Sequence, residues 1–181
     1  MGVVEVIADA AEFKRLFESL VRQIISSKID ENYAVVGIER RGAALARRIC
    51  EYLKKNRNLE LPLGVVDITL YRDDLSMTPP HPILHKTDIP FDVNGKSIVL
   101  VDDVLFTGRT VRAAMSAILD FGRPAQIQLA VLVDRGNREL PIQADFVALK
   151  VETRKTDRVE VSVTEFDGED SVRLIKGGME A

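Results

Sequence analysis

Two adjacent carboxylates, Asp102 and Asp103, directly follow the apolar run 98–101, and a Thr-Gly-Arg-Thr cluster at 107–110 comes shortly after them. Carboxylates accept hydrogen bonds without donating any, so the pair suits a ligand rich in hydroxyl groups. The cluster opens a predicted helix, whose first N–H groups and dipole favour an anion such as phosphate. Gly108 lets the backbone approach that anion closely. A diol site beside a phosphate cradle describes a ribose 5-phosphate.

The spacing of apolar residues predicts the elements that must position these groups. Helices are expected over 13–25, 43–53 and 110–122. The first would begin with a capping box formed by Asp9 and Glu12. Predicted strands cover 33–38, 63–71, 97–103, 127–134, 145–149, 158–163 and 171–175.

These strands are mostly apolar without alternation and are interleaved with helices, which favours a parallel sheet covered on both faces. We therefore predict an α/β fold, with one domain over residues 1–181 and a mainly parallel central sheet flanked by helices. An irregular, proline-rich segment precedes the strand at 97–103, and we expect a flexible hood loop over about 68–95. In open parallel sheets ligands bind beyond the carboxyl ends of the strands, where Asp102 and Asp103 fall.

Composition excludes several classes of protein. The 181 residues are 46% hydrophobic and 29% charged, which is typical of a globular protein, and the net charge of −3 argues against indiscriminate nucleic-acid binding. We expect no membrane span and no signal peptide. The single cysteine, Cys50, excludes an internal disulfide and fits a cytoplasmic protein. Neither a P-loop nor a dinucleotide-binding glycine motif is present.

Residues 99–110, VLVDDVLFTGRT, resemble the 5-phosphoribosyl-1-diphosphate (PRPP) motif of type I phosphoribosyltransferases. Three further segments, VGIERRG (36–42), DITLYRDDLS (67–76) and GRPAQIQLAVLVDRGNRELPI (122–142), resemble the family of pyrimidine-operon attenuators that are also uracil phosphoribosyltransferases. The similarity covers nearly the whole chain.

The resemblance implies transfer of a phosphoribosyl group from PRPP to uracil, giving UMP and pyrophosphate. Asp103 and Arg41 would be the catalytic residues. The implied substrate-binding residues are Arg40, Arg41, Gly42, Arg72, Asp102, Asp103, Val104, Leu105, Phe106, Thr107, Gly108, Arg109, Thr110, Asp134, Arg135 and Val151. The resemblance implies Mg²⁺ as cofactor, held mainly by PRPP and water, so that no residue is assigned to it as a ligand.

The resemblance implies that different segments of this set bind different parts of the substrates. Residues 40–42 would meet the pyrophosphate, and 105–110 would wrap the 5-phosphate. The two aspartates at 102 and 103 would hold the ribose hydroxyls. The base would be read near 133–136 and around Val151.

The resemblance also implies a regulator that binds leader mRNA of pyrimidine genes when uridine nucleotides (UMP, UTP) are bound. Contacts with RNA phosphates need Lys and Arg, and the implied RNA-binding residues are Arg22, Arg154, Lys155 and Arg158. The chain departs from the family pattern at Glu18–Ser19, where a Thr-Arg pair is common, and at Asn137, where His is common. A homo-oligomer is implied as well.

Three alternatives stay open: a nucleotide-sensing RNA-binding regulator without catalysis, a salvage enzyme without RNA binding, and a purine phosphoribosyltransferase. His81 and His85 are four residues apart, which would suit a metal on a helix. Pro82 lies between them, however, and zinc needs a third ligand. We therefore interpret the two histidines as residues of the hood loop.

Overall fold

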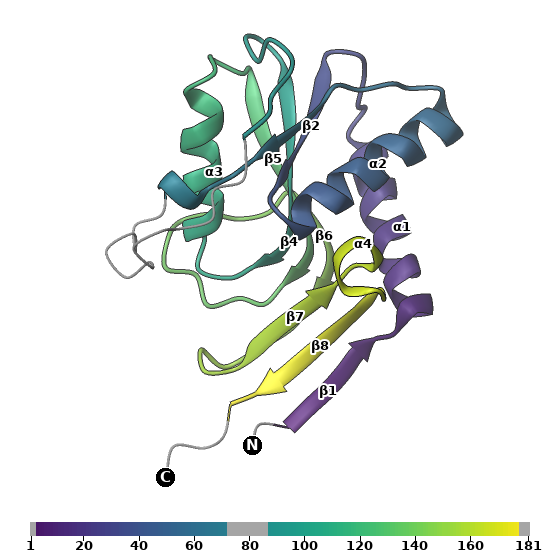
Figure 1. The fold of residues 1–181 in the computed structure, drawn as a ribbon, viewed down its shortest axis with the longest axis vertical. Helices are drawn as coiled ribbons and strands as arrows, with labels where there is room; N and C mark the ends of the chain where they lie inside the picture. The colour runs from purple at the N-terminus through teal and green to yellow at the C-terminus, as the bar shows by residue number, and fades with distance from the viewer. Residues whose placement is uncertain (1–2, 72–86, 178–181) are drawn as a thin grey trace.

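The computed structural model describes residues 3–71 and 87–177. Its strands form two sheets (Figure 1), a five-stranded sheet in the order β3-β2-β4-β5-β6 and a three-stranded sheet in the order β1-β8-β7. The large sheet is parallel and consists of β2 (Tyr33–Ile38), β3 (Leu63–Val66), β4 (Ser97–Leu105), β5 (Gln126–Asp134) and β6 (Phe146–Lys150). The small sheet is antiparallel and consists of β1 (Val3–Ala8), β7 (Arg158–Ser162) and β8 (Ser171–Lys176).

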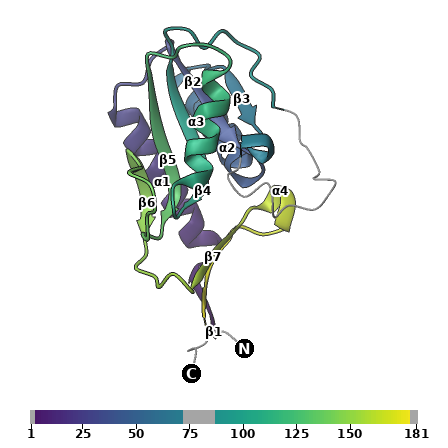
Figure 2. The ribbon, with the colours of Figure 1, turned by 90° about the vertical axis from the view of Figure 1, so that its left-hand side faces the viewer.

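Helices cover both faces of the large sheet (Figure 2). They are α1 (Ala10–Ser26), α2 (Arg41–Arg57) and α3 (Arg109–Leu119), with a short α4 (Thr164–Asp167) and the 3₁₀ turn η1 (Thr69–Tyr71). Along β4, Val99 and Val101 pack with α1 and α2, whereas Ile98 and Leu100 pack with α3. This alternation is what a strand requires when both of its faces are buried. The predicted α/β fold is confirmed.

One half of the capping box predicted at the start of α1 is present. Asp9 accepts a hydrogen bond from the N–H of Glu12 at 2.9 Å, while the Glu12 carboxylate pairs with Arg15. Near the other end of the helix, the Gln23 amide bonds both the N–H and the C=O of Val147. This side chain therefore satisfies backbone groups of β6, an edge strand of the large sheet.

Several predicted boundaries differ from the structure. The helix expected over 110–122 ends at Leu119, and the strand expected over 97–103 continues to Leu105. The strand expected over 63–71 ends at Val66, because the Asp67 carboxylate accepts the N–H of Thr69 at 2.9 Å and turns the chain into η1. The helix expected from residue 43 begins two residues earlier, at Arg41. Much of the predicted hood loop lies outside the described residues, together with Arg72, His81 and His85.

Strand β1 and helix α4 were not predicted. Strand β1 pairs with β8, at the other end of the chain, so that Val3 lies opposite Lys176. Figure 1 shows β7 and α4 beside the end of the large sheet at which α2 begins. The small sheet thus stands next to the carboxyl end of β4, where the predicted site lies.

Candidate functional site

Three loops follow the neighbouring strands β2, β4 and β5. Because these strands are parallel, their carboxyl ends meet at one edge of the sheet. The loop after β2 leads through Arg40 to α2, the loop after β4 leads through Gly108 to α3, and the loop after β5 runs from 135 to 145. The structure therefore brings the three predicted binding segments to one edge.

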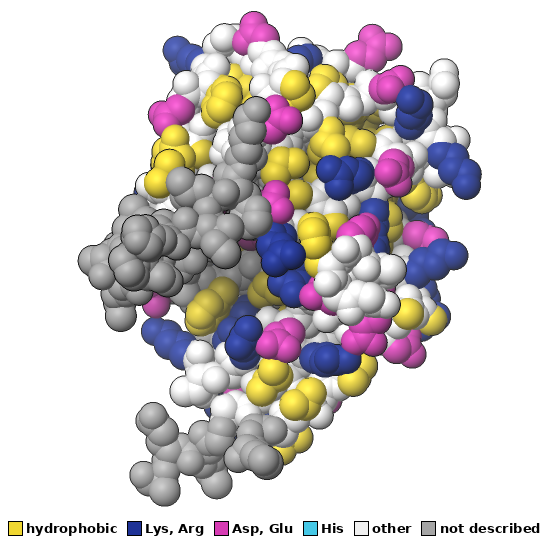
Figure 3. Space-filling view, viewed as in Figure 1, with side chains coloured by type: hydrophobic (Ala, Val, Ile, Leu, Met, Phe, Trp, Pro, Cys, Tyr) yellow, Lys and Arg dark blue, Asp and Glu magenta, His cyan; other side chains and the backbone are white. Residues whose placement is uncertain are grey.

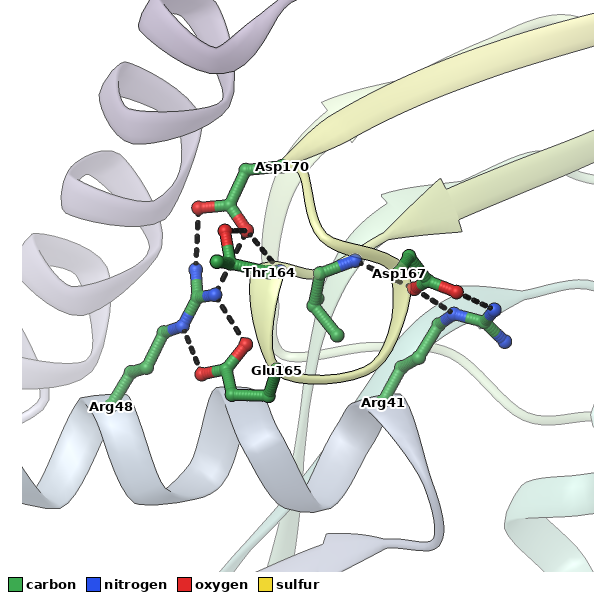
Figure 4. Close-up of polar contacts among 7 residues, drawn as sticks. Arg41, Arg48, Thr164, Glu165, Asp167 and Asp170 are labelled. Atoms are coloured by element: carbon green, nitrogen blue, oxygen red, sulfur yellow. Dashed lines mark hydrogen bonds and ion pairs between the residues drawn. The ribbon is translucent and has the colours of Figure 1, made fainter.

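A cavity of about 250 Å³ lies between the start of α2 and strand β7. Its walls include both predicted catalytic residues, Arg41 and Asp103, although they are far apart in the sequence. Arg158, which was predicted to bind RNA, lines the same cavity. The Arg41 guanidinium donates to Asp167 through Nε at 3.0 Å and Nη2 at 2.7 Å (Figure 4), and this hydrogen bonding raises the pKa of Arg41.

Gly42 explains how Arg41 reaches this position. A Cβ atom at Gly42 would lie 2.5 Å from the carbonyl oxygen of Val101 and 3.1 Å from the Cα of Asp102. Only a residue without a side chain lets α2 begin this close to β4. Gly42 thus has a packing role, because it lets Arg41 lie near the aspartates of β4, whereas its predicted contact with pyrophosphate stays a prediction.

The two adjacent aspartates have different environments. Asp102 is only 6% exposed, and burial together with the charge of Asp103 raises the pKa of Asp102 well above its usual range. Asp103 is half-buried and lines the cavity with Arg41. Strand β4 continues to Leu105, so the two carboxylates leave it toward opposite faces. Their binding of ribose hydroxyls stays a prediction.

The predicted phosphate cradle forms a turn from the end of β4 into α3. Val104 and Leu105 end the strand, and Gly108 precedes the helix with a φ of 92°. The Thr107 hydroxyl accepts the N–H of Arg109 at 3.3 Å. The first N–H groups of a helix have no partner within it, so this turn can bind an anion. The Arg109 guanidinium itself donates to Glu139 at 2.8 Å.

Arg138 joins the phosphate turn to the loop after β5, and its role was missed in the sequence. Its guanidinium donates to the carbonyl oxygens of Phe106 and Ile142, both at 2.9 Å, and to the Asp134 carboxylate at 2.6 Å. Burial favours a higher pKa for Asp134, but the Arg138 hydrogen bond and the Gly136 N–H outweigh burial and lower that pKa. The sequence feature that could have revealed this role is the position of Arg138, four residues after Asp134 at the end of the predicted strand 127–134.

The residues predicted to read the base line a second cavity, of about 500 Å³. Its walls are Asp134, Arg135, Gly136, Asn137, Lys150, Val151, Glu152 and Thr153. The Arg135 side chain is 5% exposed, lies 3.9 Å from the Phe106 ring centroid and donates to Thr153 at 3.2 Å. Asn137 bonds the Thr153 carbonyl at 2.8 Å. Arg135 thus links the turn after β4 to the wall of this second cavity, and the reading of a base there stays a prediction.

The predicted RNA-binding residues lie on two parts of the surface. Arg22 is on α1 and lies 3.8 Å from Glu18, the residue at which the chain departs from the family pattern. Arg154 and Lys155 are exposed in the turn before β7, and Arg158 lies 3.1 Å from Glu160. On the face shown in Figure 3, basic and acidic side chains lie beside one another. Binding of RNA by these residues stays a prediction.

The donor set suits magnesium. Asp103 and Glu160 are among the residues that line the smaller cavity, and Mg²⁺ prefers carboxylate oxygens while keeping several waters and substrate phosphates as ligands. Within residues 3–71 and 87–177, no three His, Cys, Asp or Glu side chains are grouped to hold a metal by themselves. The residues present therefore fit an ion bound mainly through a diphosphate. In these same ranges, no helix is long and apolar enough to cross a membrane.

Comparison with known proteins places this site in a family. The model of the phosphoribosyl transferase domain matches residues 3–167. A "Bifunctional protein PyrR" from Elusimicrobium minutum is 49% identical over 172 residues, covering 94% of this chain and 96% of the relative. The protein of the same name from Caldicellulosiruptor bescii is 53% identical over 167 residues and 92% of each chain.

Solved structures share the fold at low sequence identity. A hypoxanthine-guanine phosphoribosyltransferase from Bacillus anthracis has a TM-score of 0.68 at 13% identity, covering 94% of this chain and 97% of that one. A hypoxanthine phosphoribosyltransferase from Staphylococcus aureus has a TM-score of 0.67 at 17% identity, with 97% and 93% covered. These likenesses concern the fold alone. From the matched domain and the close relatives together, the chain belongs to the phosphoribosyltransferase family and, within it, to the PyrR proteins.

Proposed function

We propose that this protein transfers the phosphoribosyl group of PRPP to uracil, releasing pyrophosphate, and that it also regulates pyrimidine genes by binding leader mRNA when UMP or UTP is bound. The observation that carries the catalytic part is the cavity shared by Arg41 and Asp103. It belongs to the edge of the sheet that also holds the phosphate turn and the base cavity. The Arg41–Asp103 cavity would hold the pyrophosphate and the ribose, the phosphate turn the 5-phosphate, and the base cavity the uracil.

Each part of the site has a task that its chemistry suits. Loss of pyrophosphate leaves positive charge on the ribose ring and negative charge on the leaving group. Asp103 would stabilise the ring, and Arg41 would bind the leaving group. Mg²⁺, when bound to the diphosphate, supplies further positive charge there. The turn 105–110 would hold the 5-phosphate, so that catalysis depends mainly on positioning.

The enzymatic proposal is tested by following UMP formation from uracil and PRPP with Mg²⁺. We expect turnover by the wild-type protein and a large loss in Asp103→Asn. The matched control is Asp30→Asn, an exposed aspartate in the loop before β2. A protein that binds UMP but makes none would instead be a sensor without catalysis. Turnover of hypoxanthine or guanine with uracil inert would make it a purine enzyme.

The RNA-binding proposal rests on the exposed basic turn before β7. We expect UMP to strengthen binding of the organism's own pyrimidine leader RNA, and Arg154→Ala with Lys155→Ala to weaken it. The control is Lys54→Ala with Lys55→Ala, which removes two exposed cations from the end of α2. If the two double variants bind the leader RNA with the same affinity, the RNA does not bind at the turn before β7. Turnover without any RNA binding would leave a salvage enzyme.

We also propose that the protein acts in the cytoplasm, where both PRPP and mRNA are found, and that it forms a homo-oligomer. Strand β1 supports the second point, because Val3, Val4 and Val6 are each more than half exposed. Sedimentation velocity at several concentrations tests this proposal. A monomer at all concentrations would contradict it.

A further inference from the structure

A turn from Val163 to Asp170, containing α4, is bound to the side of α2 by a second arginine. Arg48 donates to Glu165 through Nε at 2.7 Å and Nη2 at 2.5 Å. It also donates to Asp170 through Nη1 at 2.9 Å and Nη2 at 2.8 Å (Figure 4). Bidentate pairs of this kind fix both distance and orientation. We call residues 163–170 the α4 turn.

The α4 turn also contacts both arginines that precede and begin α2. Asp167 accepts the two hydrogen bonds from Arg41, and the Phe166 ring centroid lies 4.9 Å from the guanidinium carbon of Arg40. Asp167 is itself held, because its carboxylate accepts the N–H of Val163 at 2.8 Å. The turn therefore offers a fixed carboxylate to Arg41 and an aromatic ring to Arg40.

The geometry of the pair leaves part of Arg41 available to a ligand. Asp167 bonds the edge formed by Nε and Nη2, and a guanidinium has five N–H donors. Among the residues that the structure describes, Nη1 of Arg41 has no hydrogen-bond partner, and the side chain is 40% exposed. Arg41 can therefore keep Asp167 on one edge and bind an anionic oxygen with the other.

We propose that Asp167 and Phe166 are positioning residues, which hold Arg41 and Arg40 in the orientation that binds the pyrophosphate group of PRPP. The inference rests on the proposed function, since it assigns the same ligand to the arginines. It adds that the C-terminal part of the chain, through the α4 turn, determines affinity for the diphosphate. Asp167 would act through Arg41, and its side chain lines the same cavity as Arg41.

The test is Asp167→Asn, which keeps the side-chain size and an oxygen for the Val163 N–H but removes the charge that orients Arg41. We expect the KM for PRPP to rise about tenfold, as for a misplaced binding group, and kcat to fall as well because Arg41 also binds the leaving group, with the KM for uracil within about twofold. Titration with magnesium pyrophosphate should show a similar loss of affinity. Asp167→Glu, which restores the carboxylate, should recover part of it and serves if the Asn variant does not fold.

The matched control is Glu165→Gln. It removes a carboxylate from the same turn, whereas Asp170 still binds Arg48 and Asp167 is unchanged. We expect wild-type KM values for this variant. An unchanged or lower KM for PRPP in Asp167→Asn would overturn the inference, and a lower one would mean that Asp167 competes with the ligand.

Pyrophosphate binding separates this inference from the proposed function. If the wild-type protein makes no UMP but binds magnesium pyrophosphate more tightly than Asp167→Asn does, the proposed enzyme fails and the role of Asp167 stands. If UMP is made and both proteins bind pyrophosphate equally, the enzyme stands and the role of Asp167 fails. A wild-type protein that does not bind pyrophosphate overturns the inference.

Discussion

Replacing Gly42 by alanine should move Arg41 away from Asp103 in the cavity that both residues line. The added Cβ would lie 2.5 Å from the Val101 carbonyl oxygen, whereas van der Waals contact needs a separation roughly 1 Å larger. The neighbour is backbone within a buried strand, so the start of α2 must move outward. Arg41, the residue before Gly42, would move with it and away from Asp103.

A displacement of about 1 Å in a positioning group can lower activity on the order of 100-fold. We therefore expect kcat/KM for PRPP in Gly42→Ala to fall by about that factor, measured by UMP formation. Overpacking should also lower the free energy of unfolding by roughly 1–3 kcal/mol. Ile49→Val, in the buried face of the same helix, controls for stability, since it should cost about 1 kcal/mol and leave activity unchanged. Activity of Gly42→Ala within twofold of wild type would refute this account of the site.

Three further outcomes are expected. Because the folded state keeps the Asp102 proton at pH values where the unfolded chain has lost it, the contribution of Asp102 to the free energy of unfolding should fall as pH rises above about 4. Urea titrations of the wild-type protein and Asp102→Asn at several pH values should therefore differ in slope against pH. An identical slope would contradict the raised pKa of Asp102. Arg138→Met should lower the free energy of unfolding by roughly 2–3 kcal/mol in the same titrations, because it leaves the Phe106 carbonyl and the Asp134 carboxylate without this donor. A decrease smaller than about 0.5 kcal/mol, which is half the value of a typical neutral hydrogen bond, would contradict this role of Arg138. Burial, and to a smaller extent the charge of Glu51, raises the pKa of Cys50 to about 11. Iodoacetamide at pH 8 should therefore alkylate Cys50 at least roughly tenfold more slowly in the folded protein than in the urea-unfolded chain. Equal rates would show that the thiol is accessible.

Sequence patterns predicted the large sheet well, because each pattern is a local property. The run 33–38 is buried on both faces and forms β2 with the expected bounds. The strand that ends in the paired aspartates is central in the parallel sheet, and the turn after it opens α3. Asp9 caps α1 through a residue three positions away. Hydrophobic periodicity and capping act over a few residues, so one segment contains the whole signal.

The elements that were missed depend on partners far along the chain. Strand β1 is marginal alone and is held by β8, which lies at the opposite end of the sequence. The α4 turn is too short for a helical pattern and is held on α2 by Arg48, through contacts 117 and 122 residues apart. The role of Arg138 could not be predicted because its three acceptors, Phe106, Ile142 and Asp134, come together only in the folded protein.

The sequence by itself determined the fold class, the family and the segments that make up the site. It also determined the charges of Arg41 and Asp103, but not that both line one cavity. Tertiary structure alone decided that Asp102 is buried while its neighbour is not, and that Asp167 holds Arg41 across 126 residues. The physical reason is that a side chain's type is local, whereas its burial, orientation and ion-pair partner depend on which distant segments the fold packs against it.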